Sequence, residues 1–207
     1  VGIAHMKKMG MDFHLECPVQ AVENSPAGAK VVCRNKDGET VSFEAEKVLV
    51  AVGRRANTDS LALSAGGITH DRGRILVNDR METSLRDIYA VGDAVQVKHY
   101  VTGEDALISL AGPANKQGRI AADNICGGDS RYLGSQGSSV IKVFSMTAAT
   151  TGINETNAKK AGLDVDKVIL SPMSHAGYYP GGKVMTMKVV FEKESCRLLG
   201  AQIVGYE

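Results

Sequence analysis

The sequence predicts a mixed architecture, in which an α/β portion is followed by an α+β unit with an antiparallel sheet. The α/β portion is indicated by a continuous apolar run at residues 48–52, which suits a strand buried on both faces, and by a long helix expected at 112–125. The α+β unit is indicated by three strand-like segments that follow one another without an intervening helix. These segments lie at residues 165–170, 184–191 and 198–204.

The opening of the chain reads as a short helix followed by an antiparallel meander. Ile3, Met6 and Met9 lie on one helical face, and Gly10 ends this helix. An Asp-Gly pair at residues 37–38 tolerates the positive φ that a hairpin turn requires. Short strands are expected at residues 11–15, 19–23, 30–34 and 40–44.

The middle of the chain alternates short apolar segments with glycine-containing turns. The long helix at 112–125 tolerates Pro113 in its first turn, and two glycines at 127–128 follow its end. A short helix is expected at 61–65, and short strands are expected at 75–77 and 88–91.

A connector rich in glycine and serine, at residues 129–139, leads into the C-terminal unit. A strand at 140–144 then precedes a helix at 154–161. Asn154 suits the N-cap of this helix because its side chain can accept a backbone N–H, and Gly162 suits the helix end.

Composition and charge exclude several classes of function. The 207 residues carry a formal net charge of +1, so no broad basic surface points to nucleic acid or to an anionic membrane. No apolar run approaches the roughly 20 residues of a membrane-spanning helix, and we expect a cytoplasmic protein with a small-molecule partner. The cysteines form no CxxC pair, so no metal site is predicted and each thiol is interpreted as a small reduced hydrophobe. They are Cys17, Cys33, Cys126 and Cys196.

A Gly-Asp pair at the end of a predicted strand is the most informative motif. Residues 83–93 run from a threonine through an apolar segment to Ala-x-Gly-Asp, so that Gly92 and Asp93 follow the strand. A strand fixes a carboxylate in space, and glycine lets the backbone approach a ligand closely. The alternative is a strand that merely ends in a Gly-Asp turn.

The residues that follow this pair favour a ligand site over a simple Gly-Asp turn. Residues 110–119 read Leu-Ala-Gly-Pro-Ala-Asn-Lys-Gln-Gly-Arg. Together with the Gly-Asp motif, this segment closely resembles the FAD-dependent pyridine nucleotide-disulfide oxidoreductases, most of all the coenzyme A disulfide reductases and the related NADH oxidases. The resemblance implies FAD and NAD(P)H as cofactors.

The resemblance also assigns roles to individual residues. In this family the aspartate accepts hydrogen bonds from the ribityl chain of FAD, a role carried to Asp93 with Gly92 beside it. The N-terminus of the next helix stabilises negative charge by about 0.3–2 kcal/mol, and a reduced flavin acquires such charge at its N1–C2=O edge. The implied cofactor-binding residues of this helix are Leu110, Ala111, Gly112 and Asn115. For Asn115 an ordinary solvated helix face is the alternative.

A second landmark begins with the apolar run at 48–52. Residues 48–58 resemble the family's crossover from the NAD(P)H domain to the FAD domain, which usually ends in Gly-Arg-x-Pro-Asn. Ala56 replaces the proline here, which loosens the turn. The family places the glycine close to the nicotinamide cofactor, so the resemblance adds Gly53 to the cofactor-binding residues.

A third landmark lies in the C-terminal unit. Residues 144–155 resemble the start of the family's dimerisation domain, and residues 175–181 resemble the tyrosine-containing loop of coenzyme A disulfide reductases. There a tyrosine hydroxyl lies near the redox cysteine of the partner subunit, and a phenol can donate a proton to a departing thiolate. Tyr178 and Tyr179 are therefore the implied catalytic residues. Two tyrosines that merely anchor a loop are the alternative.

The resemblance implies three domains and a longer parent protein. The domains are the end of an NAD(P)H-binding domain at 1–54, the second segment of an FAD-binding domain at 55–128, and the start of a dimerisation domain at 138–207. No GxGxxG loop occurs in the sequence, so neither dinucleotide phosphate cradle is present. We therefore expect a C-terminal portion that is inactive alone and binds FAD weakly, with the redox-active cysteine in the missing N-terminal part.

The implied activity of the parent protein is electron transfer from NAD(P)H through FAD to a small disulfide. Coenzyme A disulfide is the expected substrate, and a homodimer is the expected assembly. Two alternatives stay open at this point. One is an NADH oxidase that passes the electrons to oxygen, and the other is a noncatalytic dimerisation or FAD-binding module.

Overall fold

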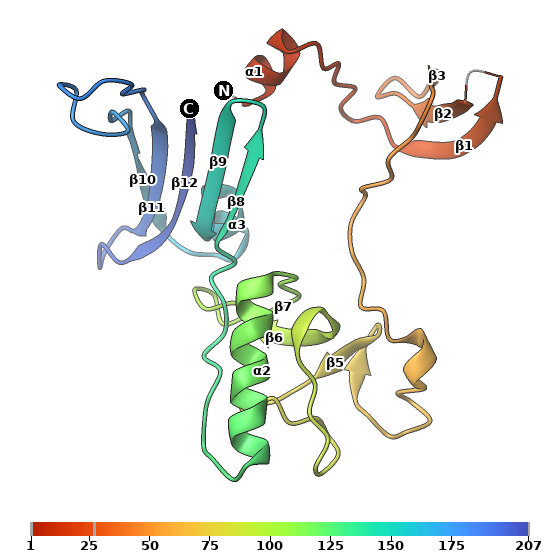
Figure 1. Ribbon diagram of the computed structural model, residues 1–207, viewed down its shortest axis with the longest axis vertical. Coiled ribbons are helices and arrows are strands. Elements are labelled where there is room, and N and C mark those ends of the chain that lie inside the picture. Colours follow the sequence, from red (N-terminus) through yellow and green to blue (C-terminus); the bar gives the residue numbers. More distant parts are fainter. Residues whose placement is uncertain (1, 27, 207) are drawn as a thin grey trace. The chain divides into compact units, whose positions relative to one another are not determined.

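The structure is a computed structural model that describes residues 2–26 and 28–206. The chain divides into two compact units, one that ends at Arg54 and one that begins at Arg55. Figure 1 labels most of the helices and strands of both units. The mixture of parallel and antiparallel pairing across them confirms the predicted α/β and α+β character.

The first unit contains a short helix and a three-stranded antiparallel meander, as predicted. The helix buries none of its residues against the rest of the unit. Gly38 has φ +82°, which allows the tight turn between the second and third strands. The elements are α1 (Gly2–Lys8), β1 (Val19–Ser25), β2 (Gly28–Arg34) and β3 (Thr40–Ala45), with β2 central.

Two strands predicted in this unit are wrong. Residues 11–15 and 48–52 form no strand, and in the second segment the side chains of Leu49 and Val52 are 90% and 88% exposed. A strand exists only where a neighbour takes its backbone hydrogen bonds. Within the part of the chain that the structure describes, no strand pairs with either segment. Apolar composition alone is therefore not enough to form a strand.

The second unit begins with a four-stranded sheet beside a long helix. The parallel pairing of β5 with β6 is flanked by antiparallel pairs on both sides. The strands, in their order across the sheet, are β4 (His70–Asp71), β5 (Arg74–Leu76), β6 (Val95–Lys98) and β7 (Asp105–Ala106).

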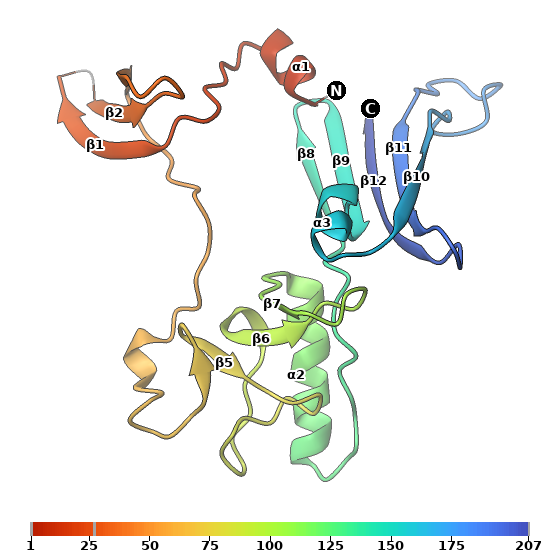
Figure 2. The same cartoon turned by 180° about the vertical axis from the view of Figure 1, so that it is seen from behind.

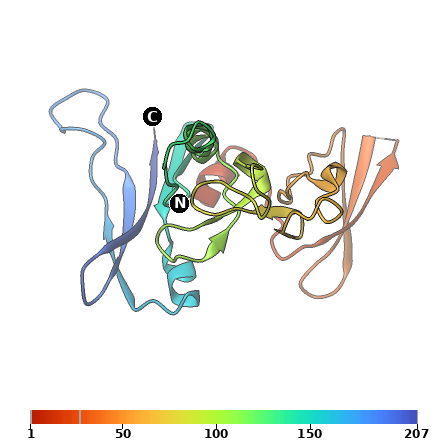
Figure 3. The same ribbon diagram turned by 90° about the horizontal axis from the view of Figure 1, so that it is seen from below.

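Helix α2 (Ala111–Ile125) confirms the predicted long helix, and Figure 3 shows it end-on, in green. Its buried Ala121 belongs to the same core as Met81, in the loop before β6, and Val95 of β6, which are each only 1% exposed. Burying such side chains stabilises the fold by about 1.5–3 kcal/mol each. The buried residues of this core are Leu63, Ile75, Met81, Val95, Val97, Ala121 and Tyr132.

Two predicted elements near this sheet differ from the structure. The expected helix at 61–65 is a single 3-10 turn, η1 (Asp59–Leu61), followed by turns. The expected strand at 88–91 makes only an isolated bridge, between Glu82 and Tyr89. A sharp turn with Asp87 at φ +63° folds this segment back on the residues before it, which leaves too few paired positions for a strand.

The C-terminal part of the second unit is a five-stranded antiparallel sheet, as predicted (Figure 2). Its order is β10-β11-β12-β9-β8, and every neighbouring pair is antiparallel. One of its strands, β9, was not predicted. The bounds are β8 (Ser139–Val143), β9 (Met146–Gly152), β10 (Val165–Leu170), β11 (Thr186–Glu192) and β12 (Leu198–Tyr206).

Helix α3 (Glu155–Lys160) covers one face of this sheet. Asn154 caps it as predicted, because its Oδ1 accepts the backbone N–H of Asn157 at 2.8 Å. The core beneath the helix is tightly closed, and Ala158 and Val190 are fully buried. Its buried residues are Ile153, Ala158, Val165, Val190 and Leu199.

A carboxylate at the start of α3 ties the helix to the sheet. The carboxylate of Glu155 accepts hydrogen bonds from the Nζ atoms of Lys159 at 2.8 Å, Lys167 at 2.8 Å and Lys188 at 2.5 Å. These bonds, that from Lys159 first, hold the pKa of the Glu155 carboxyl well below its usual range. The folded unit therefore prefers the ionised carboxylate.

We expect acid to destabilise the protein through this carboxylate. Because its folded pKa lies below the unfolded value of about 4.3, its contribution is fully present above that value. The contribution is lost as the pH falls from there through the folded pKa. Glu155→Gln should lower the free energy of unfolding at pH 7 and make it less dependent on pH, whereas the exposed control Glu194→Gln should change neither. Denaturant titrations at neutral and acid pH test this, and equal behaviour of the two variants would contradict it.

Candidate flavin site

The predicted Gly-Asp pair forms a short 3-10 turn, η2 (Gly92–Ala94), that packs against helix α2. Gly92 has φ +81°, a conformation that residues with a Cβ rarely adopt, and a Cβ there would lie 3.9 Å from the Cβ of Ala114. The backbone N–H of Gly92 donates to Oε1 of Gln117 at 2.7 Å. The exposed Asp93 side chain follows directly on this fixed glycine.

The N-terminus of α2 lies beside this turn and has no side-chain cap. Leu110 is the N-cap residue, with extended backbone angles of φ −136° and ψ 143°, and its side chain offers no acceptor. Ala111 and Gly112 are exposed, and no atom lies within 4 Å of where a Cβ on Gly112 would sit. No acidic residue occupies the first turn. The positive end of the helix is therefore open to an anionic group.

Asn115 differs from its neighbours at this helix end. Its Nδ2 donates to the backbone carbonyl of Ala111 at 3.0 Å, one turn earlier in its own helix. The side chain is exposed. This geometry occupies the amide locally, which is the behaviour of an ordinary helix-surface residue.

The donors and acceptors at this site match the chemistry of FAD. A carboxylate such as that of Asp93 accepts hydrogen bonds from hydroxyl groups, and the ribityl chain of FAD carries hydroxyls. Backbone N–H groups at Ala111 and Gly112 can donate to an oxygen that gains negative charge. The open space at Gly112 leaves room for the ligand. The residues present therefore fit the cofactor.

Gly53, the predicted nicotinamide-side glycine, belongs to the first unit. It is exposed, its φ is +134°, and no atom lies within 4 Å of where its Cβ would be. The backbone is thus accessible to a ligand at this point. A side chain in this conformation would be strained.

Tyr178 and Tyr179 lie in the loop between β10 and β11. Backbone pairing of Met173 with Val184 closes the base of this loop. The side chain of Tyr178 is 92% exposed and that of Tyr179 is 67% exposed, and the ring of Tyr179 meets His175 edge-on at 5.8 Å. Both phenols are therefore accessible to another molecule.

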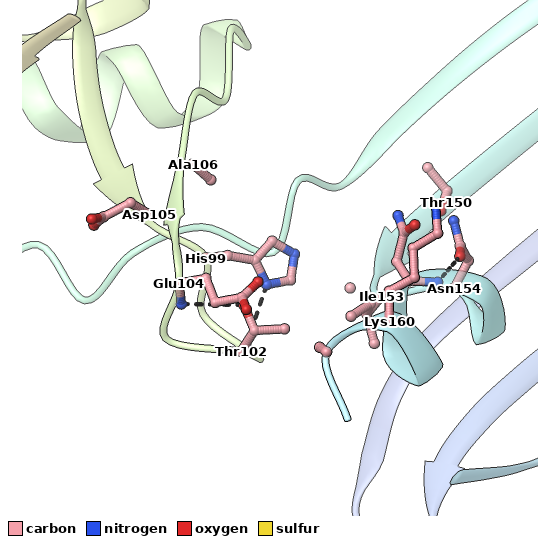
Figure 4. Close-up of a pocket in the computed structure, with 12 residues that line it drawn as sticks. His99, Thr102, Glu104, Asp105, Ala106, Thr150, Ile153, Asn154 and Lys160 are labelled. Atoms are coloured by element: carbon pink, nitrogen blue, oxygen red, sulfur yellow. Dashed lines mark hydrogen bonds between the residues drawn. The ribbon is translucent and has the colours of Figure 1, made fainter. Parts of the chain in front are cut away.

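A pocket that no sequence motif indicated lies between the β6–β7 loop and α3 (Figure 4). It has a volume of about 340 Å³, and none of the predicted site residues lines it. On its loop side, Nδ1 of His99 accepts the backbone N–H groups of Val101 and Thr102 at 3.3 and 3.4 Å. The ring proton of a neutral His99 is therefore on Nε2. Asn154 and Lys160 line the opposite side.

The described residues show neither a candidate metal cluster nor a candidate membrane span. They contain no group of three or more histidine, cysteine or acidic side chains that could hold a metal ion. Among the same residues, no helix is both long and apolar enough to cross a membrane. All four cysteines are free. Cys33 is buried, as expected of a small hydrophobe, whereas Cys126 and Cys196 are exposed.

Comparison with known proteins establishes the class of protein that this fold and site define. The family model described as pyridine nucleotide-disulphide oxidoreductase matches residues 3–118, and the model of that family's dimerisation domain matches residues 138–207. The chain therefore belongs to the pyridine nucleotide-disulphide oxidoreductase family, as the sequence motifs predicted.

Several curated relatives are similar to this chain. The NAD(P)H sulfur oxidoreductase (CoA-dependent) of Pyrococcus abyssi is 34% identical over 97% of this chain and 44% of its own length. The NADH oxidase of Methanocaldococcus jannaschii is 31% identical over 98% of this chain and 44% of its own. The coenzyme A disulfide reductase of Staphylococcus epidermidis is 32% identical over 82% and 40%, respectively. The chain thus spans less than half the length of these relatives.

Solved structures agree with this assignment. A NAD-dependent persulfide reductase from A. fulgidus matches with a TM-score of 0.89 and 34% identity, over 99% of this chain and 37% of that one. The water-forming NADH oxidase of Lactobacillus brevis bound to NADH has a TM-score of 0.87 and 27% identity, over 98% and 44%. A FAD-dependent member from Desulfovibrio vulgaris has a TM-score of 0.72 and 29% identity, over 91% and 43%. FAD and NAD(P)H, the cofactors expected from the sequence, are the cofactors of this family.

Proposed function

We propose that the protein containing this chain transfers a hydride from NAD(P)H to FAD and then reduces a small disulfide, with coenzyme A disulfide as the substrate. One observation carries the flavin part of this proposal. The Gly92-Asp93 turn packs beside the uncapped N-terminus of α2, which brings a carboxylate and backbone donors to one place.

The residues of this chain hold and orient the cofactor in this proposal. Asp93 accepts hydrogen bonds from the ribityl hydroxyls. Gly92 has no side chain, so the backbone can come close to the cofactor there. The N–H groups of Ala111 and Gly112 face the edge of the flavin that becomes negative, a placement worth about 0.3–2 kcal/mol. FAD, when bound, supplies the acceptor for the hydride. Gly53 leaves space for the nicotinamide in the first unit, and Leu110 contributes its backbone as N-cap.

The exposed tyrosine loop supports a disulfide as the electron acceptor. When a mixed disulfide between the protein and coenzyme A is cleaved, a thiolate departs and needs a proton. The phenol of Tyr178 or Tyr179 can supply it. The names of two relatives, a CoA-dependent sulfur oxidoreductase and a coenzyme A disulfide reductase, point to the same substrate class.

Oxygen is the second candidate acceptor. The NADH oxidase of M. jannaschii resembles this chain over nearly all of its length, and an oxidase needs no proton donor for a departing coenzyme A thiolate. The tyrosine loop has no defined task in that reaction. We therefore place the oxidase second.

A second copy of this chain is the proposed partner. The face of the five-stranded sheet opposite α3 carries mainly small and apolar side chains, and it borders an open pocket lined by Val140, Ala149, Ala201 and Ile203 among others. An uncovered apolar face of this kind suits an interface between two protomers. We propose that residues 138–207 supply it, that residues 55–128 hold FAD, and that residues 1–54 belong to the NAD(P)H-binding part.

Stepwise reduction under anaerobic conditions tests the proposed function. The FAD-loaded protein should lose its flavin absorbance when NADH or NADPH is added and regain it when coenzyme A disulfide follows, with release of coenzyme A thiol. Regain with oxygen but not with the disulfide would assign the oxidase activity instead. If the longer protein that contains this chain never carries flavin, both assignments are contradicted.

A further inference from the structure

Gln117 is the most deeply buried polar side chain among the described residues. It lies in the middle of α2 and is only 1% exposed. Burying a polar group costs free energy unless the group is hydrogen-bonded. The hydrogen-bond partner of Gln117 therefore indicates what this side chain does. That partner is the backbone N–H of Gly92, which donates to Oε1 of Gln117 at 2.7 Å.

The other buried polar side chains have different tasks. The hydroxyl of Thr58 donates to the carbonyl of Gly73 at 2.7 Å, far from the flavin site in sequence. Asn124 donates to the carbonyls of Arg80 and Ser130 and so closes the loop after α2. Of these three residues, Gln117 alone bonds to the turn that carries Asp93.

Helix geometry explains how Gln117 links the two halves of the site. It lies six residues beyond Ala111, which corresponds to about 9 Å along the helix axis. Helical side chains lean toward the N-terminus, so the amide reaches back along the helix toward the N-terminal turn. On the other side of the same turn, the carbonyl of Gly92 accepts the N–H of Val95. The backbone of Gly92 is thus held at both its donor and its acceptor.

We infer that Gln117 is a positioning residue that fixes the carboxylate of Asp93 relative to the N-terminal donors of α2. This inference rests on the proposed flavin site. Without the Gln117 oxygen, the half-buried Gly92 N–H would lose its acceptor, and the turn would move toward another one. Asp93 would then leave the place where it meets the ribityl chain, while the helix N-terminus would stay.

Flavin affinity of the FAD-loaded protein tests this inference. Gln117→Met keeps the volume but loses the acceptor, and it should raise the dissociation constant of FAD by up to roughly 10- to 150-fold, the loss expected when the charge-assisted hydrogen bond of Asp93 is no longer made. Gln117→Glu keeps an oxygen in reach of Gly92 and should restore affinity close to wild type. Lys116→Met, an exposed neighbour on the same helix, is the matched control and should leave affinity unchanged.

Two further measurements distinguish a positioning role of Gln117 from a general loss of structure. Amide hydrogen exchange at Gly92 should speed up in Gln117→Met while the rest of α2 keeps its protection. Combined with Asp93→Asn, the loss of affinity should be smaller than the sum of the single losses, because both changes act on one contact. Wild-type affinity in a folded Gln117→Met, or fully additive losses, would overturn the inference. If Gln117→Met does not fold, the shorter Gln117→Asn decides by the same criteria, whereas a wild type without flavin would instead refute the proposed function.

Discussion

Replacing both loop tyrosines by phenylalanine is expected to lower the turnover of coenzyme A disulfide about 100-fold or more, the usual size of general acid catalysis. Reduction of FAD by NAD(P)H should proceed at the wild-type rate, because that step precedes thiolate departure. The loop geometry permits this role, since the side chains of Tyr178 and Tyr179 are 92% and 67% exposed. Stopped-flow flavin reduction and steady-state disulfide reduction, measured side by side, give the two rates.

Single variants distinguish the two tyrosines. The ring of Tyr179 is held against His175, whereas Tyr178 is almost fully exposed, so the phenol that matters is identified by which single change reproduces the double one. Tyr100→Phe, an exposed tyrosine outside the loop, serves as the control. A double variant with wild-type turnover would make both tyrosines structural and would favour oxygen as the acceptor.

Removing the carboxylate of Asp93 is expected to weaken FAD binding roughly 10- to 150-fold, the range for a charge-assisted hydrogen bond. Asp93→Ala should therefore lose flavin on dialysis under conditions in which the wild type retains it. The side chain is exposed in the η2 turn, so the variant should still fold. Flavin absorbance per protein after dialysis measures the effect.

The matched control is Asp87→Asn, which removes the charge of another exposed aspartate a few residues earlier and keeps a residue that tolerates its φ of +63°. This variant should retain FAD like the wild type. Equal retention by the Asp93 and Asp87 variants would show that Asp93 does not contact the cofactor. The Gly92-Asp93 motif would then be only a structural turn.

Elements with local signals could be predicted from the sequence. The cap at Asn154, the turn at Gly38 and the helical stripe of α2 each depend on residues within a few positions of one another. Strands with distant partners could not be predicted in this way. Residues 48–52 have ideal strand composition but no described partner, while the alanines and glycine of β9 give its threonines no clear alternating strand pattern. Strand β9 is formed by its backbone pairing with β8 and β12, which lie far from each other in the sequence.

The same distinction between local and distant signals applies to the candidate site. The Gly92-Asp93 pair and the N-terminus of α2 are recognisable because each is a contiguous motif. Gln117 is not recognisable from a contiguous motif, because its contact with Gly92 joins residues 25 positions apart. Its place on the buried stripe with Ala121 and Asn124 was the available signal, since a polar residue on such a stripe requires a partner.

The exposed run at 48–52 has a consequence for the behaviour of the chain in solution. Extended, apolar, β-branched backbone without proline is the kind of segment that templates cross-β stacking between molecules. Lys47 and Arg54 flank it on either side. Like-charge repulsion between stacked copies opposes fibril growth at such positions. We therefore expect these two basic residues to act as gatekeepers, so that neutralising both should increase self-assembly of the chain.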